Sequence, residues 1–171
     1  DDCPAGSFCT DVFALPSGSG VCVDSCTNQA DCTRSDQGCW DPGFGQLVCW
    51  PDTCPSATAL VMGANPGDTI SSFDIHVGSC QLGGAPEVVF SYTATGDGTL
   101  DLTLSSAADM GLYVRSTCND DATEIDCVDA FIGGSDENLS LPVTTNTVYF
   151  IFVDGYDTGA EGPFTLTAAF N

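Results

Sequence analysis

Eight of the eleven cysteines lie within the first 54 residues of this 171-residue chain, and this clustering constrains the fold more than any other feature. The residues between these cysteines are rich in Gly, Pro, Ser and Asp, with little periodicity. A segment of this composition buries too little apolar surface to form a stable core, so crosslinks have to replace the core. We therefore expect residues 1–54 to form a small, loop-rich disulfide module.

The cysteines indicate disulfides rather than a metal site. No Cys-x-x-Cys pair occurs and the chain has one histidine, so zinc has little support. Disulfides require an oxidising compartment, from which we expect an extracellular or cell-surface protein. The spacing leaves the connectivity open, and we consider these pairs plausible: Cys9–Cys22, Cys26–Cys39, Cys32–Cys49, Cys54–Cys80 and Cys118–Cys127. Because eleven is odd, one cysteine remains, and we expect Cys3 to be unpaired or bonded to another chain.

Residues 55–171 have the pattern of short strands separated by turns. In "TLDLTLSS" the leucines 100, 102 and 104 alternate with polar residues, as on a strand with one buried face. The stretch "TVYFIFVDG", residues 147–155, is apolar on both faces and predicts a central strand. No segment has convincing helical periodicity. We expect an all-β fold, an antiparallel β-sandwich of about eight strands that is jelly-roll-like.

Three stretches of this region form a recognisable series. "ADMGLYVRSTC" has an Asp followed by Leu-Tyr-Val, "GSDENLSL" has a Glu at the start of a strand, and "TVYFIFVDGYDTGAEGPFTLTAAF" has two strands around a Gly-rich loop. Together they resemble the bacterial pre-peptidase C-terminal domain over residues 55–171, with Gly111 where many members have a second Asp. The cysteine-rich front part resembles spacer modules of bacterial surface proteins. The resemblance implies a secreted β-sandwich that serves anchoring, adhesion or substrate binding, and some relatives bind calcium.

The charge balance excludes several partners. The chain has 24 acidic residues against two basic ones, Arg34 and Arg115. Nucleic acid and anionic membrane surfaces both require clusters of Lys and Arg, so neither is expected as a partner. No apolar run approaches the length of about 20 residues that a membrane helix needs, so we expect no membrane insertion. Almost every carboxylate must be solvated, accept hydrogen bonds, take up a proton or bind a cation.

The densest acidic stretch is "CNDDATEIDCVD", residues 118–129. Unit charges about 4 Å apart repel each other by about 1 kcal/mol even in water. Calcium, which takes about six to eight oxygen ligands, would reverse this repulsion. The alternative is a solvated acidic loop. The candidate calcium ligands in this loop are Asp120, Asp121, Asp126 and Asp129.

A second acidic stretch follows the predicted central strand. It contains Asp154, Asp157 and Glu161 in a Gly-rich loop, where Asp and Gly are also common for turn formation alone. Loops at one edge of a sandwich converge, so residues from other strand ends could join either site. The residues that we expect there are Asp109, Asp136 and Glu137.

Catalysis has weak support in the sequence. His76 is the single imidazole, and no nucleophile elbow of the Gly-x-Ser-x-Gly kind accompanies it. We expect a structural or surface histidine and a protein that is not an enzyme. Trp40, Phe44 and Trp50 either form the small core of the disulfide module or stack on sugar rings.

We expect a non-enzymatic structural protein that self-associates into a bacterial filament or surface layer, with calcium and disulfides stabilising the assembly. A head-to-tail contact would give such a polymer. The alternative is a carbohydrate- or protein-binding accessory module of a larger secreted enzyme, and glycans are further possible partners.

Overall fold

The structure, a computed structural model, describes residues 7–10, 21–27, 31–32, 37–40, 48–51, 53–130 and 134–171. The chain divides into two compact units, Asp1–Pro55 and Ser56–Asn171. The composition of the sequence predicts this boundary one residue earlier, after Cys54. The described part of the chain holds no helix that is long and apolar enough to cross a membrane.

The first unit contains two short antiparallel hairpins. β1 (Ser7–Thr10) pairs with β2 (Val21–Asp24), and β3 (Gln37–Trp40) pairs with β4 (Val48–Pro51). Two of the expected disulfides are confirmed here, Cys26–Cys39 and Cys32–Cys49. The strand register sets Cys9 opposite Cys22. Their side chains, those of Trp40 and Trp50, and the whole of Cys3 and Phe44 lie outside the described residues.

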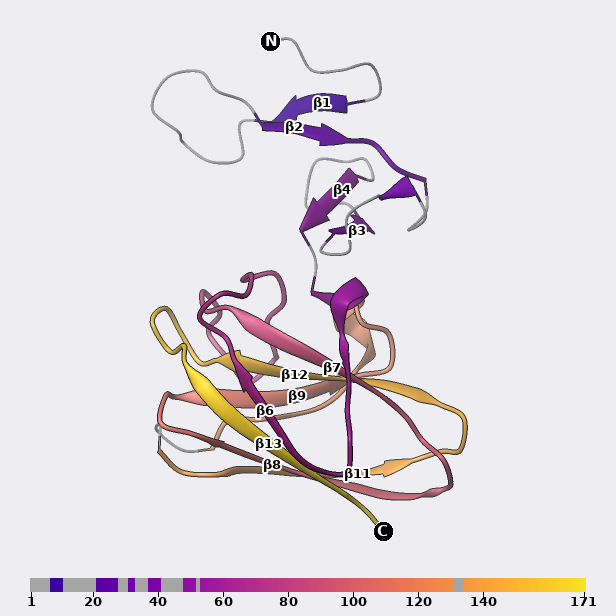
Figure 1. Cartoon of the computed structure of the whole chain (residues 1–171), viewed down its shortest axis with the longest axis vertical. Helices are drawn as coiled ribbons and strands as arrows, with labels where there is room; N and C mark the ends of the chain where they lie inside the picture. Colours follow the sequence, from indigo (N-terminus) through magenta and orange to yellow (C-terminus); the bar gives the residue numbers. More distant parts are fainter. Residues whose placement is uncertain are drawn as a thin grey trace. The chain divides into compact units, whose positions relative to one another are not determined.

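The second unit is the predicted β-sandwich, and both its sheets appear in Figure 1. One sheet has five strands in the order β10-β9-β12-β7-β5, and the other has four in the order β11-β8-β13-β6. All pairings are antiparallel except β5 with β7, which is parallel. The strands are β5 (Thr58–Ala59), β6 (Gly63–Asp68), β7 (Glu87–Thr93), β8 (Gly98–Ser106), β9 (Met110–Arg115), β10 (Glu124–Val128), β11 (Glu137–Val143), β12 (Val148–Gly155) and β13 (Pro163–Phe170).

The core between the two sheets follows the alternating pattern of the sequence. Leu100, Leu102 and Leu104 of β8 are each no more than 1% exposed, as the period of two predicts. Facing them across the core are apolar residues of the five-stranded sheet, among them Leu112 and Ile151. Burying one such side chain completely contributes about 1.5–3 kcal/mol, so this core provides most of the driving force for folding.

β12 is the central strand that its apolar composition predicts. It lies between β7 and β9, and five consecutive residues, 151–155, are buried. Burial on both faces requires a cover over the outer face of the five-stranded sheet. The segment 69–86 provides it, because its Gly78 approaches the ring of Tyr113 and its Cys80 bonds to Cys127 of β10.

Two strands of this sheet, β9 and β10, differ from what was expected. A strand in a two-layer sandwich is expected to bury one face, but all six residues of β9 are buried. The acidic stretch 118–129 was expected to be one loop, but it forms a short 3-10 turn, η3 (Asp121–Thr123), followed by the edge strand β10. The segment forms a strand because it pairs with β9. Its acidic composition gave no sign of a strand.

Candidate functional site

The outer face of the five-stranded sheet carries an aromatic stack and a buried arginine. Tyr113 of β9 and Phe152 of β12 are register partners, and their rings stack with centroids 4.5 Å apart. The guanidinium carbon of Arg115 lies 5.0 Å from the centroid of each ring. Burial raises the pKa of Tyr113 well above its ordinary value, so the phenol remains protonated. A desolvated cation–π contact of this kind contributes about 2 kcal/mol.

Arg115 fastens two loop segments to the sheet. Its Nη2 donates a hydrogen bond to the carbonyl oxygen of Val77 at 2.8 Å. Its Nη1 lies 2.6 Å from Oδ1 of Asp121, although the side chain of Asp121 is 77% exposed and that of Arg115 is fully buried. The cation that the acidic stretch lacks in its own sequence therefore comes from the neighbouring strand.

Three other carboxylates of this stretch have separate partners. Asp120 caps η3 by accepting a hydrogen bond from the amide of Ala122 at 3.0 Å. Glu124 accepts one from the amide of Ser79, and Asp126 accepts one from the amide of Cys127 at 2.9 Å. These contacts distribute the predicted ligands Asp120, Asp121 and Asp126 over different partners.

Three predicted ligands do come together at the end of β9. Asp109, Asp129 and Glu137 interact, and burial, reinforced by the charges of the other two, raises the pKa of Asp129 to about 6. Oδ1 of Asp109 and Oδ2 of Asp129 are buried and have no hydrogen-bond partner in the described part of the chain. Gly111 leaves room for the carboxylate of Asp129, because a Cβ there would lie 3.1 Å from Oδ2 of Asp129 and 3.0 Å from the oxygen of Val128.

A second group of acids surrounds Asp154, and the sequence missed two of its members. Asp154 is fully buried, and neither of its carboxylate oxygens has a hydrogen-bond partner among the described residues. Its register partner on β7 is Glu87, which is also fully buried. Burial raises the pKa of Asp154 to about 9, with the charges of Glu87 and Asp74 adding to the effect. The strand register was the signal that could have identified Glu87.

The remaining predicted ligands lie apart from these two groups. Asp136 accepts a hydrogen bond from the hydroxyl of Ser105 at 2.6 Å, and Asp157 and Glu161 are exposed. Among the described residues, no three carboxylates bring oxygens within 4.8 Å of one another. The orphaned buried oxygens fit a cation in chemistry, but a calcium ion would have to draw the carboxylates closer together.

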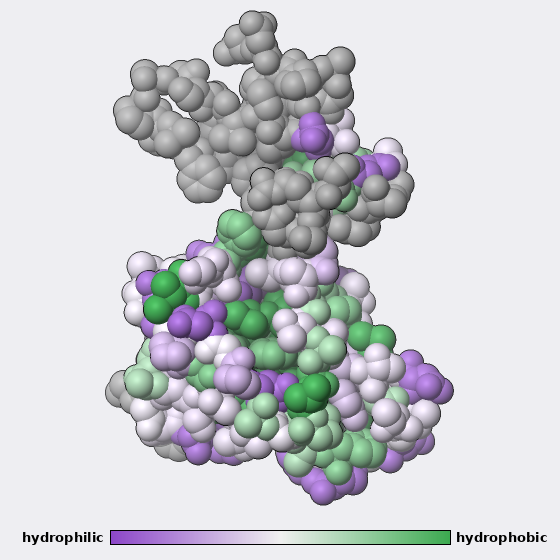
Figure 2. Space-filling model, viewed as in Figure 1, coloured by the Kyte–Doolittle hydropathy of each residue, from purple (hydrophilic) through white to green (hydrophobic). Residues whose placement is uncertain are grey.

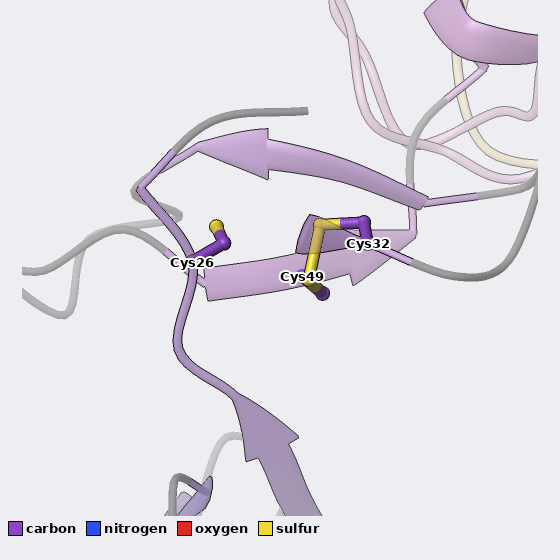
Figure 3. Close-up of side chains that lie close together, drawn as sticks. All are labelled: Cys26, Cys32 and Cys49. Carbon is purple, nitrogen blue, oxygen red and sulfur yellow. A yellow bond between two sulfur atoms is a disulfide. The ribbon is translucent and has the colours of Figure 1, made fainter. Parts of the chain in front are cut away.

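Three cysteines lie close enough together to suggest a metal site, but their chemistry excludes metal binding. Figure 3 shows Cys26, Cys32 and Cys49 close together. Their sulfur atoms lie within 4.8 Å of one another. Each is in a disulfide, Cys26 with Cys39 and Cys32 with Cys49. Metal binding needs the thiolate, so these bonded sulfurs have no ligand to offer.

Two of the predicted disulfides are wrong, Cys54–Cys80 and Cys118–Cys127. Cys80 bonds to Cys127, not to Cys54, and Cys127 is therefore unavailable to Cys118. The reason is β10, which sets Cys127 opposite Tyr113 on the outer face, beneath the covering segment that carries Cys80. Cys54 and Cys118 each take part in a disulfide, and no described cysteine is free.

His76 is a poor candidate for a catalytic base. It is 8% exposed, its ring meets the edge of the Phe152 ring at 5.3 Å, and its Nδ1 lies 3.5 Å from Nη1 of Arg115. A general base must reach a substrate proton, and this ring is packed inside the cover of the sheet.

A groove of about 420 Å³ lies at the edge where β5 ends, and sequence reasoning missed it. The segment after β5 forms one wall with Leu60 and Met62, and the last residues of β7 form another. None of the described residues that line the groove carries a charge. Figure 2 shows hydrophobic residues gathered where the chain runs from β5 to β6. Further lining residues are Tyr92, Thr93, Thr95 and Phe170.

No protein-family profile and no curated protein matches the sequence. Among solved structures, the chain is similar to the pre-peptidase C-terminal domain of a collagenase from Bacillus anthracis. The TM-score is 0.46 at 14% identity, over 66% of this chain and 94% of that one. It is also similar to the K3 cleaved adhesin domain of Lys-gingipain from Porphyromonas gingivalis, with a TM-score of 0.34 at 14% identity over 78% of each chain. A domain of the family that residues 55–171 resemble is thus among the similar structures.

Proposed function

We propose that this chain is a non-catalytic binding module of an exported bacterial protein, and that it attaches to a carbohydrate or a protein through the groove beside β5. The observation that carries the proposal is the absence of charge among the residues that line this groove, on a chain with 24 acidic residues. Neutral apolar walls with a few hydroxyl groups are typical of binding sites for uncharged ligand surfaces.

The exposure of neighbouring side chains supports the same function. Met62 is 46% exposed and Val61 is 57% exposed, although both are large and apolar. Contiguous apolar surface of this kind, bordered by polar residues, is typical of interaction sites. By contrast, His76 is packed within the covering segment 69–86 and Glu87 and Asp154 are fully buried, which favours a structural role for them.

Self-association into a filament or surface layer stays a prediction. The formal net charge of −22 makes close packing of identical copies unfavourable unless cations neutralise part of it. Calcium at the orphaned carboxylates would reduce this repulsion, so the two predictions depend on each other.

Binding of the whole chain to two immobilised collections tests the proposal, one of glycans and one of short peptides. We expect binding to at least one collection, and we expect Met62→Glu to abolish it by placing a charge in the groove. Ile125→Glu is the matched control, because Ile125 is 45% exposed on β10, at the opposite edge of the same sheet. Binding that survives Met62→Glu unchanged, or no binding to either collection, would refute the proposal.

A further inference from the structure

The groove lies where one edge of the five-stranded sheet loses its neighbouring strand. β5 has two residues, and its pairing with β7 covers only Phe90 and Ser91. One further bond follows, from the amide of Leu60 to the oxygen of Ser91 at 2.9 Å. Beyond it the chain leaves the sheet for β6, whereas β7 continues to Thr93. The last part of β7 therefore has no paired strand on this side in the described sandwich.

The backbone of Thr93 faces this groove. The amide of the next residue, Ala94, donates to the oxygen of Thr147, and the oxygen of Ala94 accepts from the amide of Asn146. These groups point toward β12, and backbone groups alternate in direction along a strand. The amide and carbonyl of Thr93 therefore point the other way, toward the groove that Thr93 lines.

The side chains around this free edge suit an extended peptide better than a sugar. Tyr92 is 7% exposed and offers no open platform for a pyranose, and Phe170, the other aromatic residue of the lining, is half-buried. The groove also lacks the Asp, Asn, Gln and Arg side chains that usually bind sugar hydroxyls. What it offers is a backbone donor and acceptor at Thr93, with apolar walls from Leu60 and Met62. Strand addition uses main-chain hydrogen bonds for affinity and side-chain pockets for specificity.

Charge at the end of the groove selects among peptides. Thr95 lines the groove, and Asp97 follows in the same turn, whose Gly96 approaches the ring of Phe170. Asp97 accepts hydrogen bonds from the amide and hydroxyl of Thr145, which lower its pKa and keep it ionised. An acidic peptide would be repelled here, and so would a second copy of this acidic chain.

We infer that the groove binds an extended polypeptide segment of another protein, with apolar residues at its centre and Lys or Arg beside them, by adding a short strand next to Thr93. This inference rests on the proposed binding function and names its ligand class. The peptide backbone pairs with Thr93, its apolar side chains pack on Leu60 and Met62, and its basic residue lies near Asp97.

The test uses blocked synthetic hexapeptides with Val, Ile and Thr at the centre and lysine at both ends, measured by fluorescence polarisation against the whole chain. We expect saturable binding that weakens at least about tenfold in Met62→Glu and remains unchanged in Ile125→Glu. N-methylation of the central peptide bonds removes the backbone donors and should also weaken binding about tenfold or more. Glutamate in place of the lysines should abolish binding, and Asp97→Asn should weaken it about threefold and reduce its salt dependence.

Three outcomes overturn the inference, and they differ in what they leave standing. Binding to the glycan collection alone, lost in Met62→Glu, would refute the peptide ligand and leave the binding function intact. Peptide binding that tolerates N-methylation would refute strand addition. Absence of both peptide and glycan binding would refute the inference together with the proposed function.

Discussion

Replacing Asp154 by Asn should change how the stability of the sandwich depends on pH. Asp154 is buried beside two other acids, and its carboxylate has no hydrogen-bond partner among the residues that the structure describes. Its pKa is raised from 3.8 to about 9. The unfolded chain releases this proton near the ordinary value, whereas the folded chain keeps it. Between the two values the folded state holds one proton more than the unfolded state, so stability falls as the pH rises.

The magnitude follows from the width of this window. Each pH unit inside it costs about 1.4 kcal/mol of unfolding free energy. From pH 5 to pH 8 the group should therefore lower the stability of the natural chain by about 4 kcal/mol, relative to a chain with a neutral amide at this position. Asp154→Asn keeps the shape of the side chain and removes its titration, so the variant should be the more stable protein at pH 8.

Urea unfolding of both proteins at several pH values, with a chelator present, measures this difference. Parallel stability curves for the two proteins between pH 5 and pH 8 would refute the electrostatic reasoning. A second series with calcium tests the cation prediction, because an ion beside Asp154 would replace the proton. Calcium should then flatten the curve of the natural chain and leave that of Asp154→Asn unchanged.

Three further predictions concern stability. The Cys80–Cys127 disulfide joins residues 47 positions apart. Replacing both cysteines by serine should lower the free energy of unfolding in urea by about 4 kcal/mol. A loss below about 1 kcal/mol would contradict the role of this disulfide in fastening the cover. Arg115→Met should lower the free energy of unfolding by about 3 kcal/mol, because the guanidinium is fully buried. Asp121→Asn should lower it by less than about 1 kcal/mol, because this side chain is exposed. Equal losses would argue against the asymmetry of this ion pair. Gly111→Ala should lower the melting temperature because its Cβ would lie 2.8 Å from Nε2 of Gln81, and Gly96→Ala, with 3.5 Å to its nearest neighbour, should not.

Alternation along the strands made the sandwich predictable, because it reports burial on one face of each strand. Leu100, Leu102 and Leu104 are buried as expected, and the apolar run of β12 correctly indicated a central strand. Parts of the fold without this pattern were missed. β10 reads as an acidic loop because it is an edge strand with exposed residues such as Ile125 and Asp126, and its pairing partner is not apparent from local sequence.

The candidate sites were less predictable than the fold, because they depend on register and on long-range cover. Asp109, Asp129 and Glu137 were all proposed as ligands and do interact, but they were not expected to separate from Asp120 and Asp121. Glu87 joins Asp154 only through the pairing of β7 with β12. The groove arises where β5 stops short of the end of β7, which no local pattern of residues indicates.

The burial of Arg115 also determines how well the sandwich resists trypsin-like proteases. Residues 56–171 contain no lysine and no other arginine, so trypsin-like enzymes have a single bond to attack in this unit, the one after Arg115. That residue ends β9, and its side chain is fully enclosed by its neighbours. Cleavage there needs the sheet to open first, so the folded unit should survive digestion in surroundings where secreted trypsin-like proteases are abundant.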